Sequence, residues 1–356
     1  MRTSIVRNAR PREGCAAPRP KGAAGRSRIR SVRLASGQTT RGHGRVWAIT
    51  SYFNPVGYQR RLSNYRMFRA NLGVPLVTVE LSFGGRFELT DQDADILIQL
   101  HGGALLWQKE RLLNLALKAV PSNVTKIAWL DCDVILERSD WVDEANSRLE
   151  EFKLVQLFSE VLHINSEDFE KRSHLRSDYA AVPGIVSLSN ARELMSLGRQ
   201  EQERLKFVSK KEEIYKMGLA WAADRGLLED HGFYDASIVG SGDRLMVSAM
   251  YGRFEDSTRL FLFKGAVQQH YLRWAVPFHK SAAERLGHLS GTIFHLKHGE
   301  LKNRRYLARH EQLAGFGFDP DSDIRIGANG AWQWARPRPD LEEFLRNYFV
   351  SRDEDE

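Results

Sequence analysis

Short apolar runs alternate with stretches of helical spacing through the first third of the ordered chain. The predicted strands cover residues 46–52, 75–81, 95–100 and a run from 126, and the predicted helices cover 58–72 and 105–120. Turn signals at 53–55 and helix stops at Gly73 and Pro121 separate these elements. Strands that alternate with helices predict the α/β class, with a mostly parallel central sheet flanked by helices.

The periodicity weakens after residue 160. A short strand is predicted at 154–158, whereas 163–215 is charged and irregular and is interpreted as surface helices and a mobile loop. A terminal helix is predicted at 341–349, and the acidic residues 353–356 are expected to be solvated. No internal repeat is visible, and 356 residues suffice for one large domain or two ordinary ones.

The net charge of +7 is concentrated at the N-terminus. Residues 1–45 contain twelve Lys and Arg residues and one acid, Glu13, so their surplus of eleven leaves a net charge of −4 for the rest of the chain. Residues 1–44 are rich in Arg, Gly, Ala, Ser and Pro, and we predict a disordered basic tail. A nucleic-acid or membrane-surface arm, a transit peptide and a start codon placed too far upstream stay open.

Cysteine content and hydropathy indicate the compartment. The two cysteines, Cys15 and Cys132, cannot form a disulfide framework or a four-ligand zinc site, which suits a reducing compartment. No apolar run approaches the ~18 residues that span a bilayer. A soluble, cytoplasmic protein without a transmembrane segment is therefore expected.

The most informative stretch is the apolar run at 126–130, which ends in Asp131, Cys132 and Asp133. Side chains alternate along a strand, so Asp131 and Asp133 share one face. Two adjacent carboxylates repel each other unless a cation separates them, and oxygen ligands suit Mn²⁺ or Mg²⁺. Other Asp-x-Asp pairs occur, but only this one follows a buried-strand pattern. A solvated turn is the alternative reading.

Two later stretches could complete such a site. Glycines and Trp221 precede Asp243 within 218–243, and an aromatic face suits the apolar face of a sugar ring. Asp243 could be a general base or the N-cap of the helix that follows. His295 and His298 follow an apolar run, and imidazole is a normal Mn²⁺ ligand. Earlier in the chain, Lys109 in the predicted 105–120 helix could reach a diphosphate or lie on an exposed helical face.

The order buried strand, Asp-x-Asp, Gly-x-Ala-Trp-Ala, Gly-x-Tyr-Asp, Gly-x-Gly-Asp and His-x-x-His-Gly resembles a GT-A fold glycosyltransferase. The middle block is most similar to the C-terminal region of β-1,4-galactosyltransferase-type enzymes. The resemblance covers roughly residues 46–310. It differs from the family pattern after the glycines, where a denser acidic run is reduced to Asp243 followed by Arg244.

The resemblance implies a Rossmann-like GT-A domain at 45–350. Its expected parts are a nucleotide-sugar-binding half at 45–160, an acceptor and catalytic half at 161–310 and a C-terminal extension at 311–350. The implied activity is metal-dependent, inverting transfer of a hexose, in a galactosyltransferase-like manner. The sugar would move from a UDP-sugar or another nucleoside-diphosphate sugar to a hydroxyl of a carbohydrate or glycan acceptor. The family's eukaryotic members have membrane anchors and disulfides, so a bacterial or phage-like enzyme is expected.

The resemblance also implies roles for particular residues. Asp243 is expected to be catalytic, and Mn²⁺ or Mg²⁺ is expected at Asp131, Asp133, His295 and His298. Donor contacts are expected from Thr50, Ser51, Tyr52, Asn54, Arg61, Lys109 and Asp131. Acceptor or sugar contacts are expected from Trp221, Gly240, Ser241, Gly242 and Asp243.

Three other functions stay open at this point. A nucleotidyltransferase acting on a sugar phosphate would use the same half-sheet and metal carboxylates. A non-catalytic nucleotide-sugar or carbohydrate-binding protein would need Asp243 only as a cap. A nucleic-acid-binding protein led by the basic tail would bind in a strongly salt-dependent manner, but the negative charge of the remaining chain argues against it.

Overall fold

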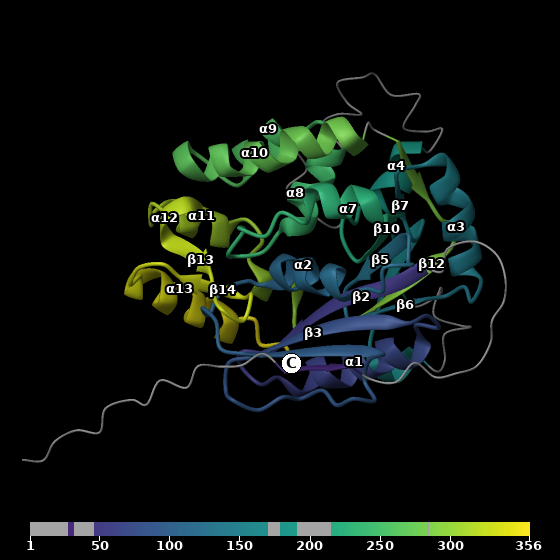
Figure 1. Ribbon diagram of the computed structural model, residues 1–356, viewed down its shortest axis with the longest axis horizontal. Coiled ribbons are helices and arrows are strands. Elements are labelled where there is room, and N and C mark those ends of the chain that lie inside the picture. The colour runs from purple at the N-terminus through teal and green to yellow at the C-terminus, as the bar shows by residue number, and fades with distance from the viewer. Residues whose placement is uncertain (1–27, 32–45, 170–178, 191–214, 283–284) are drawn as a thin grey trace, which may run out of the picture.

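The computed structural model describes residues 28–31, 46–169, 179–190, 215–282 and 285–356. An eight-stranded sheet forms the centre of the molecule (Figure 1). Its spatial order is β1 (Arg28–Ser31), β4 (Ile96–His101), β3 (Leu76–Ser82), β2 (Val46–Phe53), β5 (Lys126–Leu130), β10 (Ala220–Asp224), β7 (Leu154–Gln156) and β11 (Leu286–His288).

The middle of this sheet is parallel, as the alternating sequence pattern predicts. Strands β4, β3, β2 and β5 are parallel neighbours, whereas β10 runs antiparallel to both β5 and β7. Antiparallel pairing places the start of β10 beside the carboxyl end of β5, where Ala220 pairs with Leu130. Residues before β10 and residues after β5 therefore meet at the same edge of the sheet.

Helices cover both faces of the sheet, which explains why β2 is apolar at nearly every position. Trp47 and Ile49 contribute to one core, with α2 (Lys109–Ala119), α7 (Arg225–His231), α8 (Gly242–Met250) and α10 (Gly265–Ala282). Val46 and Ala48 contribute to the other core, with α1 (Gln59–Asn71) and α3 (Trp141–Glu151). The result is a three-layer α/β architecture, and the predicted fold class is confirmed.

A smaller sheet packs beside the first, in the order β6 (Val134–Leu136), β12 (Thr292–Leu296), β8 (Glu160–Ile164) and β9 (Ala181–Pro183). Shorter elements complete the fold: α4 (Ile185–Asn190), α9 (Phe254–Leu260), the 3₁₀ turn η2 (Leu301–Arg304), α11 (Ala308–Ala314), α12 (Pro320–Asp323), the hairpin β13 (Ile324–Ile326) and β14 (Trp332–Trp334), and α13 (Pro339–Val350). In Figure 1 the yellow C-terminal elements lie together at one end of the molecule.

Several predicted elements differ from the structure. The helix predicted from 105 begins at Lys109, and the stretch around Trp221 is a central strand, β10. Part of the irregular 163–215 segment is ordered as β9 and α4, whereas 170–178 and 191–214 lie outside the described residues. Within the predicted tail, Arg28–Ser31 forms β1, antiparallel to β4. None of the described helices is long and apolar enough to cross a membrane.

Candidate active site

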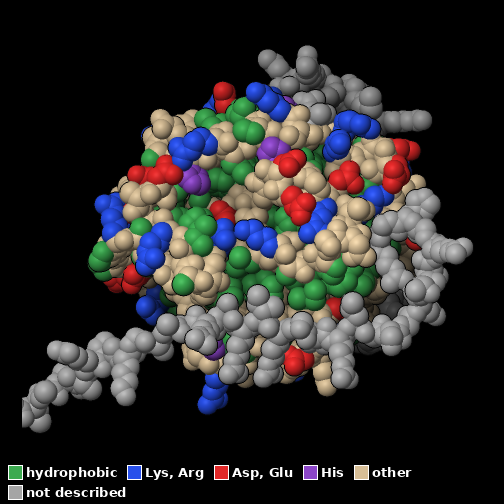
Figure 2. Space-filling model, viewed as in Figure 1, with side chains coloured by type: hydrophobic (Ala, Val, Ile, Leu, Met, Phe, Trp, Pro, Cys, Tyr) green, Lys and Arg blue, Asp and Glu red, His purple; other side chains and the backbone are tan. Residues whose placement is uncertain are grey.

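A pocket of about 190 Å³ opens at the carboxyl end of β5. It is lined by Ser51, Phe53, Arg61, Trp107, Lys109, Asp131, Cys132, Asp133, His163, Tyr215, Lys216, Met217, Gly218, Leu219, Ser241, Asp243, Arg244, His295, His298, Arg304, Tyr306, Arg309 and Arg352. The face in Figure 2 shows Lys and Arg side chains around a hollow near its centre. The ends of parallel strands are the usual place for ligands in α/β sheets.

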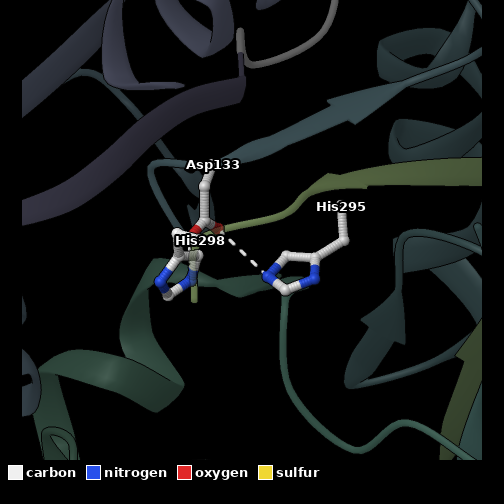
Figure 3. Close-up of side chains that lie close together, drawn as sticks. All are labelled: Asp133, His295 and His298. Carbon is white, nitrogen blue, oxygen red and sulfur yellow. Dashed lines mark ion pairs between the residues drawn. The ribbon is translucent and has the colours of Figure 1, made fainter. Parts of the chain in front are cut away.

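Pairing between the two sheets brings the carboxylate and the histidines together. The chain passes from β5 through Asp133 into β6, and Val134 of β6 pairs with His295 of β12. The amide of Leu296 donates to the carbonyl oxygen of Asp133 over 2.9 Å. His298 follows two residues after β12 ends. Asp133, His295 and His298 each offer one ligand atom, and these atoms lie within 4.8 Å of one another (Figure 3).

The charges of this group suit a divalent cation. Burial holds the pKa of His295 well below its ordinary value, so its imidazole is neutral and has a lone pair to offer. Burial alone would raise the pKa of Asp133, but His295, His298 and Arg304 outweigh burial, and this carboxyl stays ionised. Its Oδ1 atom has no hydrogen-bond partner among the described residues and lies 3.7 Å from His295 Nε2. One carboxylate and two imidazoles can hold a divalent transition-metal cation, and the carboxylate suits Mn²⁺.

Neighbouring side chains orient both imidazoles. His163 Nδ1 lies 2.7 Å from His295 Nδ1, so a proton shared there leaves His295 Nε2 facing Asp133. Glu354 Oε1 lies 3.5 Å from His298 Nδ1, an ion-pair distance without a hydrogen bond, while His298 Nε2 lies 2.9 Å from Asp133 Oδ2. Metal-binding histidines commonly have their second nitrogen fixed by such partners. The C-terminal segment thus forms part of the site, and the expectation that 353–356 are solvated is wrong for Glu354, which is 2% exposed.

Asp131, the first carboxylate of the Asp-x-Asp pair, forms an ion pair with Lys109. Its Oδ1 atom lies 2.5 Å from Lys109 Nζ, and the same ammonium donates to both oxygens of Asp243 over 3.0 and 2.9 Å. Burial raises the pKa of Asp131 to about 6, although Lys109 opposes this effect. Lys109 is 9% exposed, so the exposed-face interpretation of this residue is wrong. The structure groups Asp131 with Lys109 and Asp243, apart from the three possible metal ligands.

Asp243 lies inside α8 rather than at its N-cap. Ser241 precedes the first helical residue, and its φ of +69° places it in the left-handed region. The first turn of α8 contains Asp243, whose negative charge is favoured by the helix dipole. A Cβ atom at Gly218 would lie 2.5 Å from Asp243 Oδ2, so glycine at 218 lets this carboxylate lie against the pocket wall.

The predicted donor-binding residues divide into two groups. Ser51, Arg61, Lys109 and Asp131 line the pocket. Three others are engaged elsewhere: Thr50 Oγ1 donates to Leu130 O over 2.7 Å, Tyr52 donates to Glu88, and Asn54 Nδ2 donates to Tyr58 O over 2.9 Å. Thr50 and Tyr52 are almost fully buried, and neither lines the pocket.

Most of the predicted acceptor-binding residues do not line the pocket. Trp221 is 2% exposed and stacks on Trp129 with ring centroids 6.4 Å apart, so it belongs to the core and presents no face to a sugar. A Cβ atom at Gly240 would lie 3.1 Å from Trp107, and one at Gly242 would lie 2.1 Å from Glu110. These glycines make room for the start of α2. Of this set, Ser241 and Asp243 line the pocket.

Several pocket residues were missing from the predicted set. His163, Arg304, Arg309 and Arg352 line the pocket, and Glu354 lies directly behind His298. Arg304 and Arg309 lie in a basic stretch shortly after the histidines, and this proximity is the signal that could have found them. His163 follows the strand predicted at 154–158 and carries no motif. Arg352 and Glu354 lie more than fifty residues after His298, so no local pattern connects them with the site.

Comparisons with known proteins found distant similarity to solved structures. No protein-family model matches the chain, and no curated protein sequence matches it. The similar solved structures include Staphylococcus aureus TarS with UDP-GlcNAc, at 11% identity and TM-score 0.37, covering 86% of this chain and 72% of that one. They also include a mutant Drosophila β1,4-galactosyltransferase 7 with manganese, UDP-Gal and xylobiose, at 10% identity and TM-score 0.37, covering 85% and 98%. A third is mannosyl-3-phosphoglycerate synthase from Rubrobacter xylanophilus, at 11% identity and TM-score 0.35, covering 76% and 72%.

Proposed function

We propose that this protein is a metal-dependent glycosyltransferase that moves a sugar from a nucleoside-diphosphate sugar to an acceptor hydroxyl. The observation that carries the proposal is the convergence of Asp133, His295 and His298 in one pocket with Lys109 and Asp243. A cation-binding group and a separate carboxylate in the same pocket are the two parts that such a transfer needs.

Asp133, His295 and His298 would hold Mn²⁺ or Mg²⁺, with His163 and Glu354 orienting the imidazoles. When bound, the cation would offset negative charge on the diphosphate leaving group. Arg304 would assist, because it lines the same pocket and would add its positive charge beside the phosphates. Asp131 would act through Lys109 rather than as a metal ligand, which revises the predicted ligand set.

Asp243 would take the proton from the acceptor hydroxyl. In the free protein both Asp243 oxygens accept hydrogen bonds from Lys109, which holds the carboxylate in one orientation. An acceptor hydroxyl that donates to one of these oxygens would be deprotonated as it attacks the anomeric carbon from the side opposite the leaving group. This is the inverting course that the sequence resemblance implies. The same resemblance supports a UDP-linked hexose as donor, a carbohydrate acceptor and a soluble bacterial enzyme. The cysteine content supports a cytoplasmic location.

The decisive experiment measures Mn²⁺-dependent UDP binding by titration calorimetry in the wild type and in Asp133→Asn. We expect Asp133→Asn to lose metal-dependent binding and to stay folded, because the amide keeps the shape and removes the charge. Asp235→Asn is a matched control, since Asp235 pairs with Arg111 over 3.1 Å and does not line the pocket. Equal Mn²⁺-dependent UDP binding in wild type and Asp133→Asn would reject the metal assignment.

Turnover separates the remaining possibilities. Hydrolysis of a UDP-sugar by water can stand in for transfer until an acceptor is known. Consumption of a nucleoside triphosphate together with a sugar phosphate would identify a nucleotidyltransferase instead. Donor binding without any donor hydrolysis or transfer would identify a binding protein.

A further inference from the structure

Among the described residues, more cationic than anionic side chains line the pocket. Seven Lys and Arg side chains line it against three carboxylates, and Glu354 behind the wall adds a fourth. A divalent cation and the phosphates of a nucleoside-diphosphate sugar offset each other. Binding both would therefore add no net charge, and a buried cation of the pocket still needs a counter-ion of its own.

Three of the cationic groups already have carboxylate partners. Arg61 Nη1 lies 2.7 Å from Glu354 Oε2, and Arg352 Nη2 lies 2.5 Å from Glu354 Oε1. Lys109 lies between Asp131 and Asp243. These pairs are structural parts of the pocket wall and leave little positive charge for a ligand.

Arg309 differs because all its partners are neutral. It is 2% exposed, yet its guanidinium donates only to Ser241 Oγ over 2.7 Å, to the carbonyl oxygen of Arg304 over 3.3 Å and to the hydroxyl of Tyr348. Among the described residues no carboxylate forms an ion pair with it, and its Nε atom has no hydrogen-bond partner. A buried charge without a counter-ion is costly.

The surroundings of Arg309 keep the guanidinium in place. Its Cζ atom lies 5.0 Å from the centroid of the Tyr306 ring and 5.5 Å from that of Tyr348. Stacked aromatic rings stabilise a guanidinium without neutralising it. A planar guanidinium held in this way is suited to bind a carboxylate or phosphate through two parallel hydrogen bonds. Because Arg309 lines the pocket, a ligand can supply the missing negative group.

Arg309 lies on the Asp243 side of the pocket. Its Nη2 atom contacts Ser241, two residues before Asp243, and would lie 3.4 Å from a Cβ atom at Gly240. The possible metal ligands face Arg304 instead. The diphosphate is expected beside the metal ligands, so the group bound by Arg309 belongs to the acceptor or to the transferred sugar.

We propose that one of the two sugars carries a carboxylate or phosphate group and that Arg309 binds it. This inference rests on the proposed function and specifies its substrate class as acidic. The two sources of the group are an acidic acceptor, such as a uronic acid or a sugar phosphate, and a donor whose transferred sugar is a uronic acid.

Titration calorimetry with Mn²⁺ present tests both sources. The donor arm compares UDP-glucuronate with UDP-glucose, and the acceptor arm compares glucuronate and glucose 6-phosphate with glucose in the presence of UDP. We expect the acidic member of one arm to bind at least about tenfold more tightly, the effect of hydrogen bonds to a charged group. Arg309→Gln should abolish this preference and leave UDP binding unchanged, and Arg309→Lys should retain part of it.

The control is Arg325→Gln, which removes an exposed positive charge on β13 outside the pocket. Equal binding of acidic and neutral sugars in both arms would overturn the proposal, even if Mn²⁺-dependent UDP binding persisted. A loss of UDP affinity in Arg309→Gln would also overturn it, because Arg309 would then belong to the diphosphate site. Arg309-dependent binding of glucuronate without any UDP binding would support the anion site and reject the glycosyltransferase function. The wild-type preference decides the outcome even if Arg309→Gln does not fold.

Discussion

At the scale of single residues, Lys109 connects the two carboxylates that the sequence treats as separate motifs. Its ammonium contacts Asp131 and Asp243, which lie 112 positions apart in the sequence. Burial would lower the pKa of Lys109, but Asp131 and Asp243 outweigh burial and hold it well above the ordinary value. Lys109 is therefore a permanent cation, and it keeps Asp243 oriented before any substrate arrives.

The role of Asp243 is tested by Asp243→Asn. The amide preserves the shape, and Lys109 keeps Asp131 as its partner, so we expect the fold and UDP binding to persist. Transfer, or hydrolysis of a UDP-sugar in its place, should fall about 10²–10⁴-fold, because an amide cannot accept the acceptor proton. Initial rates with saturating donor measure the effect. Wild-type turnover by this variant would exclude Asp243 as the base.

At the scale of elements, the site depends on which strands are neighbours. Asp133 enters the pocket because β5 continues through it into β6, in the second sheet. His295 joins it because β12 pairs with β6, although more than 150 residues separate Asp133 from His295. The motifs name these residues, but strand pairing decides which of them meet. This explains why Asp133 joins the histidines and Asp131 does not.

The edge strand β1 connects the N-terminal segment with the central sheet. A protein that begins at Arg45 would lose the pairing of β1 with β4 and expose the edge of β4. We expect a lower thermal midpoint or a greater tendency to aggregate, with Mn²⁺-dependent UDP binding unchanged, because β4 lies at the opposite end of the parallel strands from β5. Thermal unfolding and calorimetry measure the two properties. An unchanged midpoint would show that β1 contributes nothing to stability, and lost UDP binding would show that the tail belongs to the site.

At the scale of the whole molecule, the last residues of the chain complete a pocket begun by the first strands. Glu354 pairs with Arg61 of α1 and with Arg352, and it lies beside His298. Burial would raise the pKa of Glu354, but Arg61 and Arg352 outweigh burial and hold it well below its ordinary value. Stability from this carboxylate is therefore full above its ordinary pKa and is lost as the pH falls towards its pKa in the folded protein.

Glu354→Gln tests this contact between the chain ends. Removing one partner of a buried ion pair leaves Arg61 and Arg352 without their carboxylate, and we expect unfolding to require roughly 3–5 kcal/mol less free energy at neutral pH. The deficit should shrink as the pH falls, because the wild-type carboxylate then becomes protonated as well. Denaturant titrations between pH 3 and 7 measure it, and Glu356→Gln, at an exposed position, is the control. A deficit independent of pH would contradict this account.

The sequence by itself determined the α/β architecture and the residues with the clearest chemistry. Strand and helix periods are local, so β2, α1, β3 and β5 could be predicted from short windows close to their observed bounds. The carboxylates after β5 and the two histidines could be named because their residue types suit few other purposes at the end of an apolar strand. These features depend on neighbours in the sequence, and the sequence shows those directly.

Only the tertiary structure decided which residues share the pocket and which fill the core. Trp221 and the glycines at 240 and 242 looked like a sugar platform, but β10 is central to the sheet, and Trp107 and Glu110 pack against those glycines. Lys109, His163, Arg309 and Glu354 entered the site through contacts between segments far apart in the sequence. Burial, ion pairing and the absence of a counter-ion are properties of such contacts, and a pattern of residue types along the chain cannot encode them.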